Sequence, residues 1–529
     1  MECVKLRKMA KGLAEVLTRV AILGMSAQIL LGLFWILTHF STFPNYEESL
    51  FLLKVQESLG FDEYTGILYP LLMRLLSMVA GAFSMPFYCL IYMIQLGVAA
   101  WAVFFFVTGL GGMKKTAGWF RVLIALTLLT MPVAVQCHLA VLPYSLAGSF
   151  FLMQLGMLLR AVRRVEQTEL LLHEAKEEPA EQSLRVAKEE PSGLLPDKKE
   201  ESAGQKKEKA WHGWKRPAWN LVRMGLAWTL QVFLLPEYYL FGGLLLVFYG
   251  LWESFGKRED KEVSAKEEVA RALPILLLTA IFLSLIPCIM KMTVKEGAYQ
   301  RMYPTAEGAA VRRIAWENFE KLQSYFPKEL EESLSASDVE EIQKYPEQMI
   351  WILGRAVDAS RGKKEARRIY GEFARAVFRN YYGKTVKETV KDAIAYELSP
   401  AYYLLALSGK GHYTQLPKNH EIMRHGTPLL TTIFVSFGGW CFLGVLLLGA
   451  CLQAATLIRR RGKERWLAIR ELIAVFLTGM AMVAYYSLWA GGAMDDKKTY
   501  VIALLWVAAA GNAIANNIRF EQKEKKAGE

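Results

Sequence analysis

Apolar residues in this chain gather in long uninterrupted runs separated by shorter polar segments. Each run covers about 18 to 25 residues, the length a helix needs to cross roughly 30 Å of hydrocarbon. A soluble protein would distribute its apolar residues with helical or strand periodicity instead. The pattern predicts an all-α, polytopic helical membrane protein with about ten transmembrane helices. They are expected at residues 17–40, 85–109, 119–137, 141–159, 219–235, 239–254, 271–293, 428–456, 467–490 and 499–518.

Basic residues near the ends of these runs predict the orientation. The predicted outer short loops carry only Lys54, Lys497 and Lys498, whereas the inner segments are rich in Lys and Arg. This asymmetry predicts that both termini lie in the cytoplasm of a multi-pass cell-membrane protein.

Residues 20–40 are too long for the apolar region of a cleaved signal and are expected to form a retained first span.

Residues 66–84 are apolar enough to resemble a further span, but Arg74 lies in their middle. Counting them as a span would invert every later loop and contradict the distribution of basic residues. We therefore expect a helix that lies at the outer interface, or that dips into the membrane and returns.

Two hydrophilic segments interrupt the runs. Residues 165–216 contain AKEEP twice and almost no aromatic residues, which predicts a disordered cytoplasmic insert, a solvated linker rather than a regulatory docking segment. Residues 295–426 contain stretches with apolar residues three and four positions apart, which predicts a helical extracytoplasmic domain. Within it, Ser337 and Glu340 are expected to form a capping box at a helix start.

The predicted divisions follow from these segments. They are an N-terminal membrane module with an outer acidic loop and the interfacial helix (1–164), the insert (165–216), membrane helices (217–294), the extracytoplasmic domain (295–426), and C-terminal membrane helices with a cytoplasmic tail (427–529). The aromatics of the domain are expected to form its core, with contact to an acceptor substrate as the alternative: Trp316, Phe319, Tyr325, Trp351, Tyr370 and Phe373.

Composition and charge narrow the class further. The net charge of +12 is concentrated at span ends, so it indicates membrane orientation rather than nucleic-acid binding. The six cysteines lie mostly in apolar runs without C-x-x-C spacing. We therefore expect packing residues, not a disulfide framework or a zinc site.

Acidic residues at the predicted outer ends of spans are the first candidates for chemistry. Glu47 and Glu48 follow the first span, and Asp62 and Glu63 precede the interfacial helix. Solubility alone explains many outer acids, and Asp62 and Glu63 also suit a helix N-terminus. Glu237, in the short turn LLPEYYL, lies so close to apolar helices that it is a functional-site candidate, although an interfacial turn acid explains it nearly as well.

The order of these features resembles the N-terminal half of GT-C-class membrane glycosyltransferases, the protein O-mannosyltransferase and aminoarabinose transferase-like enzymes. "EESLFLLKVQESL" places Glu47 on the Asp of that family's first outer loop, and "GILYPLL" stands where the family has a Pro-Pro-led helix. The resemblance covers about residues 17–290. The chain departs from the pattern in having Glu for Asp, one Pro for two, Tyr144 where many members carry an acid, and no Arg in LLPEYYL.

The resemblance implies sugar transfer from a polyprenyl-phosphate donor to a glycan or protein acceptor on the outer face. A carboxylate there would deprotonate the acceptor hydroxyl or support the positive charge at the anomeric carbon. This implies Glu47 and Glu48 as the catalytic pair, with Glu47 as the reacting carboxylate and Glu48 orienting it or the acceptor. The donor phosphate needs cations, first Arg74 and then Lys54. Snorkelling is the competing interpretation of Arg74.

Two further residues complete the predicted site. His138, at a short outer turn, is a substrate-binding candidate whose alternative is a purely structural role. Glu237 is expected to share a cavity with Glu47, Glu48 and Arg74, roofed by the extracytoplasmic domain.

The sequence predicts no definite cofactor. A divalent metal near Glu47 is an open alternative, although no complete ligand set is present. No nucleic acid is expected, and membrane lipids are expected partners.

Two other functions are compatible with the pattern. One is a non-catalytic, GT-C-like envelope-assembly protein, suggested by the missing acid at Tyr144. The other is a transporter or flippase, which would favour charges inside spans and inverted repeats. Few mid-span charges and no convincing repeat are present, so the transferase is the leading hypothesis.

Overall fold

The computed structural model describes the helical core of the chain. The described residues are 66–83, 87–110, 118–138, 141–161, 215–235, 238–255, 265–293, 310–387 with gaps at 312–313, 315–318, 345–348, 363, 367 and 385, then 428–459, 465, 469, 473 and 499–527. Every regular element among these residues is a helix, so the all-α prediction is confirmed for this part of the chain. The predicted span 17–40 lies outside it, as do 467–490 apart from residues 469 and 473 and the 165–216 insert apart from its last two residues.

Helices stand at the described apolar runs. Within the described residues, three stretches are long and apolar enough to cross a membrane: Leu90–Gly109, Gly439–Arg459 and Tyr500–Asn517. The helices of this bundle are α3 (Leu68–Ala82), α4 (Phe87–Gly109), α5 (Gly118–Thr130), α6 (Pro132–His138), a helix at 144–161, α9 (Lys215–Leu234), α10 (Tyr238–Phe255), α11 (Ala265–Thr293), α19 (Pro428–Arg459) and α21 (Thr499–Ala527).

The predicted span 119–137 is divided into two helices. Met131 separates α5 from α6, and Pro132 is the first residue of α6. Proline lacks the amide hydrogen that a continuous helix needs, and it disfavours helical geometry in the preceding residue. The break follows directly from this one proline.

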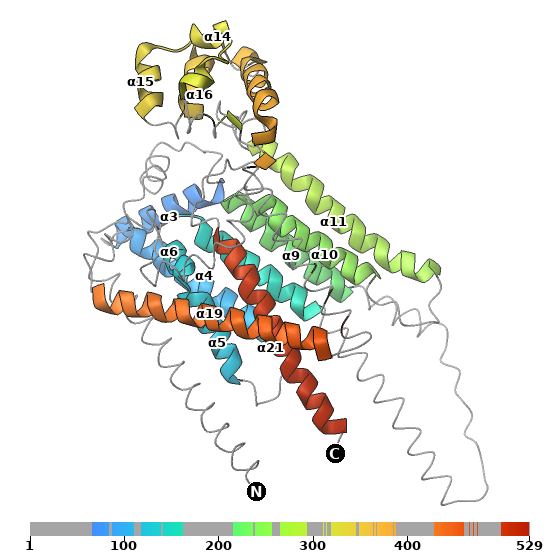
Figure 1. The fold of residues 1–529 in the computed structure, drawn as a ribbon. Coiled ribbons are helices and arrows are strands. Elements are labelled where there is room, and N and C mark those ends of the chain that lie inside the picture. Colours follow the sequence, from blue (N-terminus) through green and yellow to red (C-terminus); the bar gives the residue numbers. More distant parts are fainter. Residues whose placement is uncertain are drawn as a thin grey trace, which may run out of the picture.

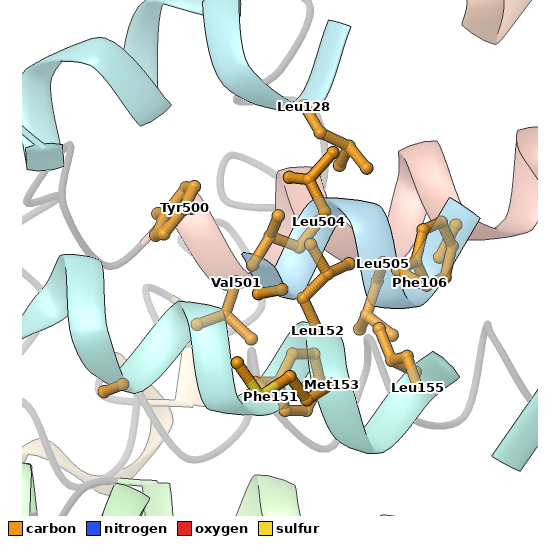
Figure 2. Packing of buried hydrophobic residues seen from close by; sticks show 14 of the residues in the cluster. Phe106, Leu128, Phe151, Leu152, Met153, Leu155, Tyr500, Val501, Leu504 and Leu505 are labelled. Atoms are coloured by element: carbon orange, nitrogen blue, oxygen red, sulfur yellow. The ribbon is translucent and has the colours of Figure 1, made fainter. Parts of the chain in front are cut away.

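The helix at 144–161 lies at the centre of the bundle. Figure 2 shows its Phe151 and Leu152 among side chains of α21, including Leu504, with Phe106 of α4 and Leu128 of α5 beside them. All five are almost fully buried. The first and last thirds of the chain therefore share one hydrophobic core.

Buried glutamines add polar contacts to this apolar bundle. Gln154 donates to the carbonyl oxygen of Met224 at 3.0 Å, and Gln231 donates to the side-chain oxygen of Gln154 at 2.7 Å. Gly242 of α10 faces this pair: a Cβ there would lie 2.5 Å from Gln231 Oε1 and 2.5 Å from Trp228 Cδ1. The absence of a side chain at residue 242 lets three helices meet around the two amides.

Two sets of contacts define the ends of the bundle. We call the end formed by residues 66–69, 141–145, 235–238 and Tyr500 the α3 end; its contacts are given below. We call the opposite end of the bundle the Arg160 end. There, the Arg160 guanidinium donates to the carbonyl oxygen of Phe105 at 2.8 Å and lies 3.6 Å over the Phe105 ring. Toward this end, the Asn517 amide of α21 also donates to the Thr456 hydroxyl of α19 at 3.0 Å.

Residues 310–387 form a separate helical unit with its own core. Figure 1 shows it beyond the bundle, on the side of α3. Its helices are α13 (Phe319–Gln323), α14 (Lys328–Glu331), α15 (Ala336–Lys344), α16 (Met349–Arg361) and a last helix at 368–384. Tyr370 and Phe373 are buried in its core as predicted, and Tyr325 packs against that core. The side chains of Trp316, Phe319 and Trp351 lie outside the described residues.

The predicted capping box in this unit is wrong by two residues. The backbone amide of Asp338 donates to the Ser335 hydroxyl at 3.2 Å, and the amide of Ser335 donates to the Asp338 carboxylate at 3.0 Å. Ser335 therefore caps α15 with Asp338 as its reciprocal partner, not Ser337 with Glu340. Aspartate is short, but it still reaches back to the capping residue.

Candidate functional site

The predicted site divides into residues that the structure describes and residues that it does not. Arg74 and His138 are described. Glu47, Glu48, Lys54, Asp62, Glu63 and Glu237 lie outside the described residues, so their predicted roles stay predictions. The turn that carries Glu237 is nevertheless flanked by described residues on both sides, which fixes where α9 ends and α10 begins.

The start of α3 lies against the end of α9. Gly66 adopts a positive φ of 61°, and a Cβ at this position would collide with the backbone carbonyl of Phe233. Only glycine combines this conformation with such a close approach at low cost. The contact brings the first turn of α3 next to the α9–α10 turn, where Glu237 stands in the sequence.

A buried glutamine joins α3 to a second turn. Gln95 of α4 is fully buried, and its amide nitrogen donates to the Tyr69 hydroxyl at 3.2 Å and to the carbonyl oxygen of Leu142 at 2.8 Å. Tyr69 belongs to the first turn of α3, and Leu142 precedes the helix at 144–161. Gln95 thus connects the start of α3 to the turn next to His138.

His138 forms a buried contact among three elements. Its Nδ1 lies 2.7 Å from the Ser145 hydroxyl oxygen, and its ring meets the Tyr500 ring edge to face at a centroid distance of 5.9 Å. The imidazole is only 2% exposed, and its Nε2 has no hydrogen-bond partner within the described part of the chain. This environment fits a residue that positions the end of α6, the start of helix 144–161 and the start of α21.

Arg74 lies one and a half turns into α3. It is half-buried, and none of the ion pairs found among the described residues involves it. One face of α3 is buried through Tyr69 and Met73, while the apolar Leu75 and Met78 are each 59% exposed. With 15 residues, α3 is shorter than the roughly 20 residues that a transmembrane helix needs.

This arrangement gives Arg74 a surrounding suited to an amphiphilic ligand. An apolar exposed face accommodates acyl or prenyl chains, and a guanidinium offers paired donors to a phosphate. Among the described residues, no group of three His, Cys, Asp or Glu side chains is placed to hold a metal ion.

Some residues at the α3 end were not identified as candidates from the sequence. Gln95 carried a usable signal, since it is a polar residue inside an otherwise apolar run. Ser145 and Tyr500 carried none, because a hydroxyl near the end of a span is common. Their importance depends on contacts between segments far apart in the chain.

The α3 end therefore brings together four segment ends: the start of α3, the turn before helix 144–161, the α9–α10 turn and the start of α21. Comparison with known protein families, with curated proteins and with solved structures finds no match for this chain.

Proposed function

We propose that the chain is an integral membrane glycosyltransferase that uses a polyprenyl-phosphate-linked sugar at the α3 end of the bundle. The observation that carries the proposal is the close approach of Gly66 to Phe233, which unites the interfacial helix with the Glu237 turn. Arg74, a cation with an apolar exposed surface beside it, is the element that a lipid phosphate requires.

The proposed reaction is a single displacement at the anomeric carbon. The Glu47 carboxylate accepts the proton of the acceptor hydroxyl, whose oxygen forms the new bond to the anomeric carbon. The bond from that carbon to the donor phosphate oxygen breaks, and its electron pair leaves with the phosphate. Arg74, with Lys54, stabilises this leaving group. Glu48 and Glu237 orient the acceptor and Glu47.

His138 contributes indirectly in this scheme. Because the imidazole is buried against Ser145 and Tyr500, it holds the helix ends that frame the site rather than contacting the sugar.

We expect the acceptor to be a glycan or a protein, and the donor to reach Arg74 laterally from the lipid. We also propose ten spans, cytoplasmic termini and an outer location for the unit at 310–387.

The test is sugar transfer in membranes that carry the protein or a variant of it. Radiolabelled nucleotide sugars are added, so that the membranes form labelled lipid-linked donors. The radioactivity transferred to the outer glycan and protein fractions is then counted. Glu47→Gln keeps the size of the side chain and removes the base, so it should abolish transfer without loss of folded protein. Glu63→Gln is the matched control and should be mild.

Two outcomes would favour the other functions. Full transfer by Glu47→Gln, or no transfer by any form of the protein, would favour a non-catalytic assembly role. Movement of a lipid-linked sugar across vesicles without transfer would favour a flippase. Donor-phosphate binding is tested separately: Arg74→Gln should weaken retention of a polyprenyl phosphate, whereas Arg223→Gln, beside Trp219 on α9, should not.

A further inference from the structure

The last helix of the 310–387 unit has two halves with different charge. In its first half, Arg368 is surrounded by acids, with Glu365 at 2.6 Å, Glu372 at 3.0 Å and Glu329 of α14 at 3.7 Å. These charges compensate one another at the surface. The first half of the helix therefore presents no large field of either sign.

The second half is basic and aromatic. Residues 373–387 contain no Asp or Glu, and Glu388 is the next acid along the chain. Tyr382 is 58% exposed and Val386 is 44% exposed. We call this surface the basic–aromatic end; it consists of Arg375, Phe378, Arg379, Tyr382, Lys384, Val386 and Lys387.

Neighbouring aromatic rings order this surface. Phe378 meets Tyr382 edge to face at 5.4 Å, and Tyr381 meets Tyr325 at 5.9 Å. Lys321 of α13 lies 5.3 Å from the centre of the Tyr381 ring and adds a cation from an adjacent helix. The aromatic side chains are thus held in place beside cations, half in contact with the core and half outside it.

The position of the unit indicates what the basic–aromatic end faces. The Tyr239 hydroxyl, at the start of α10, donates to the carbonyl oxygen of Leu283, so α11 continues beyond the α3 end of the bundle to Thr293. The 310–387 unit therefore follows α11 on this side. Figure 1 shows the helix at 368–384 running from the far side of the unit toward the membrane helices.

We propose that the basic–aromatic end docks on the anionic phospholipid headgroups that surround the α3 end of the bundle. Tyr and Phe suit the boundary between headgroups and acyl chains, where an apolar ring and a polar tip are both accommodated. Lys and Arg are attracted to an anionic leaflet within about 10 Å of it, and salt screens this attraction. On this helix, exposed aromatic rings and an excess of positive charge occur together in the half directed at the bundle.

Docking also gives the exposed apolar side chains a partner. Tyr382 and Val386, four residues apart on the helix, would otherwise expose their apolar surface to water. The inference does not require enzymatic activity: it depends on the charge, composition and direction of one helix. Docking would hold the 310–387 unit at a fixed distance from the membrane surface at the α3 end.

The test uses the full chain in vesicles of phosphatidylcholine, alone or with one quarter phosphatidylglycerol. A bimane label is attached at Gly383→Cys, where a side chain would meet no atom within 4 Å, in a chain whose native cysteines are replaced by alanine. Quenching by brominated phospholipid reports contact with lipid. A label at Ser360→Cys, at the end of α16, is the control position, and hydrogen exchange of residues 375–387 in the unlabelled protein is the second measurement.

We expect quenching at residue 383 to rise at least twofold in anionic vesicles, to fall with added salt, and to be absent at residue 360. Arg379→Gln with Lys387→Gln should lower the docked-to-undocked ratio about fivefold for each cation removed. Lys328→Gln with Lys364→Gln removes two cations elsewhere on the unit and should leave the quenching unchanged. Equal quenching in both vesicles, or the same loss with the control pair, would overturn the proposal. Protection of the label by a soluble oligosaccharide instead of lipid would also overturn it and assign the surface to a glycan.

Discussion

The helical bundle and the 310–387 unit both have apolar cores, but they differ in the polar groups that they bury and in the large apolar side chains that they expose. In the bundle, Gln95, Gln154 and Gln231 are completely buried, while Trp101 is 59% and Trp440 is 68% exposed. In the unit, aliphatic and aromatic side chains are buried and the Arg368 ion pairs lie at the surface.

This difference indicates two different solvents. In water, burial of apolar surface stabilises a fold, and charged groups belong outside. In hydrocarbon, apolar side chains gain little by leaving the solvent, so helices associate through close contacts and hydrogen bonds between them. Identical substitutions should therefore have different effects in the two regions.

The largest contrast is expected for phenylalanine. Phe373 is fully buried against Phe326 in the unit, whereas Phe104 of α4 is 68% exposed. Phe373→Ala should lower the stability of the unit by about 3–5 kcal/mol through lost burial and a cavity. Phe104→Ala should cost almost nothing if lipid surrounds it. Hydrogen exchange of each region in the reconstituted protein measures both effects, and equal losses would contradict the assignment of two solvents.

Close contact in the bundle is tested with two glycines in helices. Gly242→Ala places a Cβ 2.5 Å from the Trp228 ring, which is itself fixed by a hydrogen bond to the Tyr239 carbonyl. We expect a loss of about 1–3 kcal/mol from this overpacking. Gly444→Ala, where no atom lies within 4 Å, should be neutral or slightly stabilising. Unfolding in a denaturing detergent compares the two, and equal behaviour would show that the contact at Gly242 can relax freely.

The paired amides should show coupling. Gln154→Leu leaves the Gln231 amide without its acceptor in a buried position, which should cost about 1–2 kcal/mol. The double substitution Gln154→Leu with Gln231→Leu should cost less than the sum of the two single ones, because no unpaired amide remains. Additive losses in the same detergent assay would mean that the amides act independently.

The smallest effect is expected from the surface charges of the unit. The hydrogen bond from Arg368 lowers the pKa of the Glu365 carboxyl below its ordinary value. Because the folded pKa is below the unfolded value of about 4.3, the contact stabilises above that pH and is lost as pH falls through the folded pKa. Both side chains are 46% exposed, so the change should be slight. Hydrogen exchange of residues 364–384, corrected for its intrinsic pH dependence, should show this step; Arg368→Gln should remove it, while Arg379→Gln should preserve it.

Local features of the fold could be predicted from the sequence. Uninterrupted apolar runs have only one stable arrangement in lipid, so the described helices lie where the runs lie. Helix boundaries were predicted less well: α11 begins at Ala265, before the predicted 271, because Lys and Glu are good helix formers that an apolar pattern does not detect. The cap at Ser335 was missed because several Ser and Asp residues in SLSASD compete for the same role.

The candidate site was predictable only in part. The sequence identified Arg74 and His138 as candidates; the structure links the first turn of the Arg74 helix to Leu142 through Gln95, and His138 to Ser145 three residues further on. The contact of Gly66 with Phe233 joins segments distant in the chain and has no local signature. The buried state of His138 likewise depends on Tyr500, which belongs to the last helix.

The membrane orientation is tested most directly by labelling intact cells with a membrane-impermeant thiol reagent. Ser360→Cys reports on the 310–387 unit, and Ser183→Cys reports on the insert. We predict labelling at residue 360 and none at residue 183 until the membrane is opened. The reverse pattern would place the α3 end in the cytoplasm and contradict both the orientation and the proposed outer-face transfer.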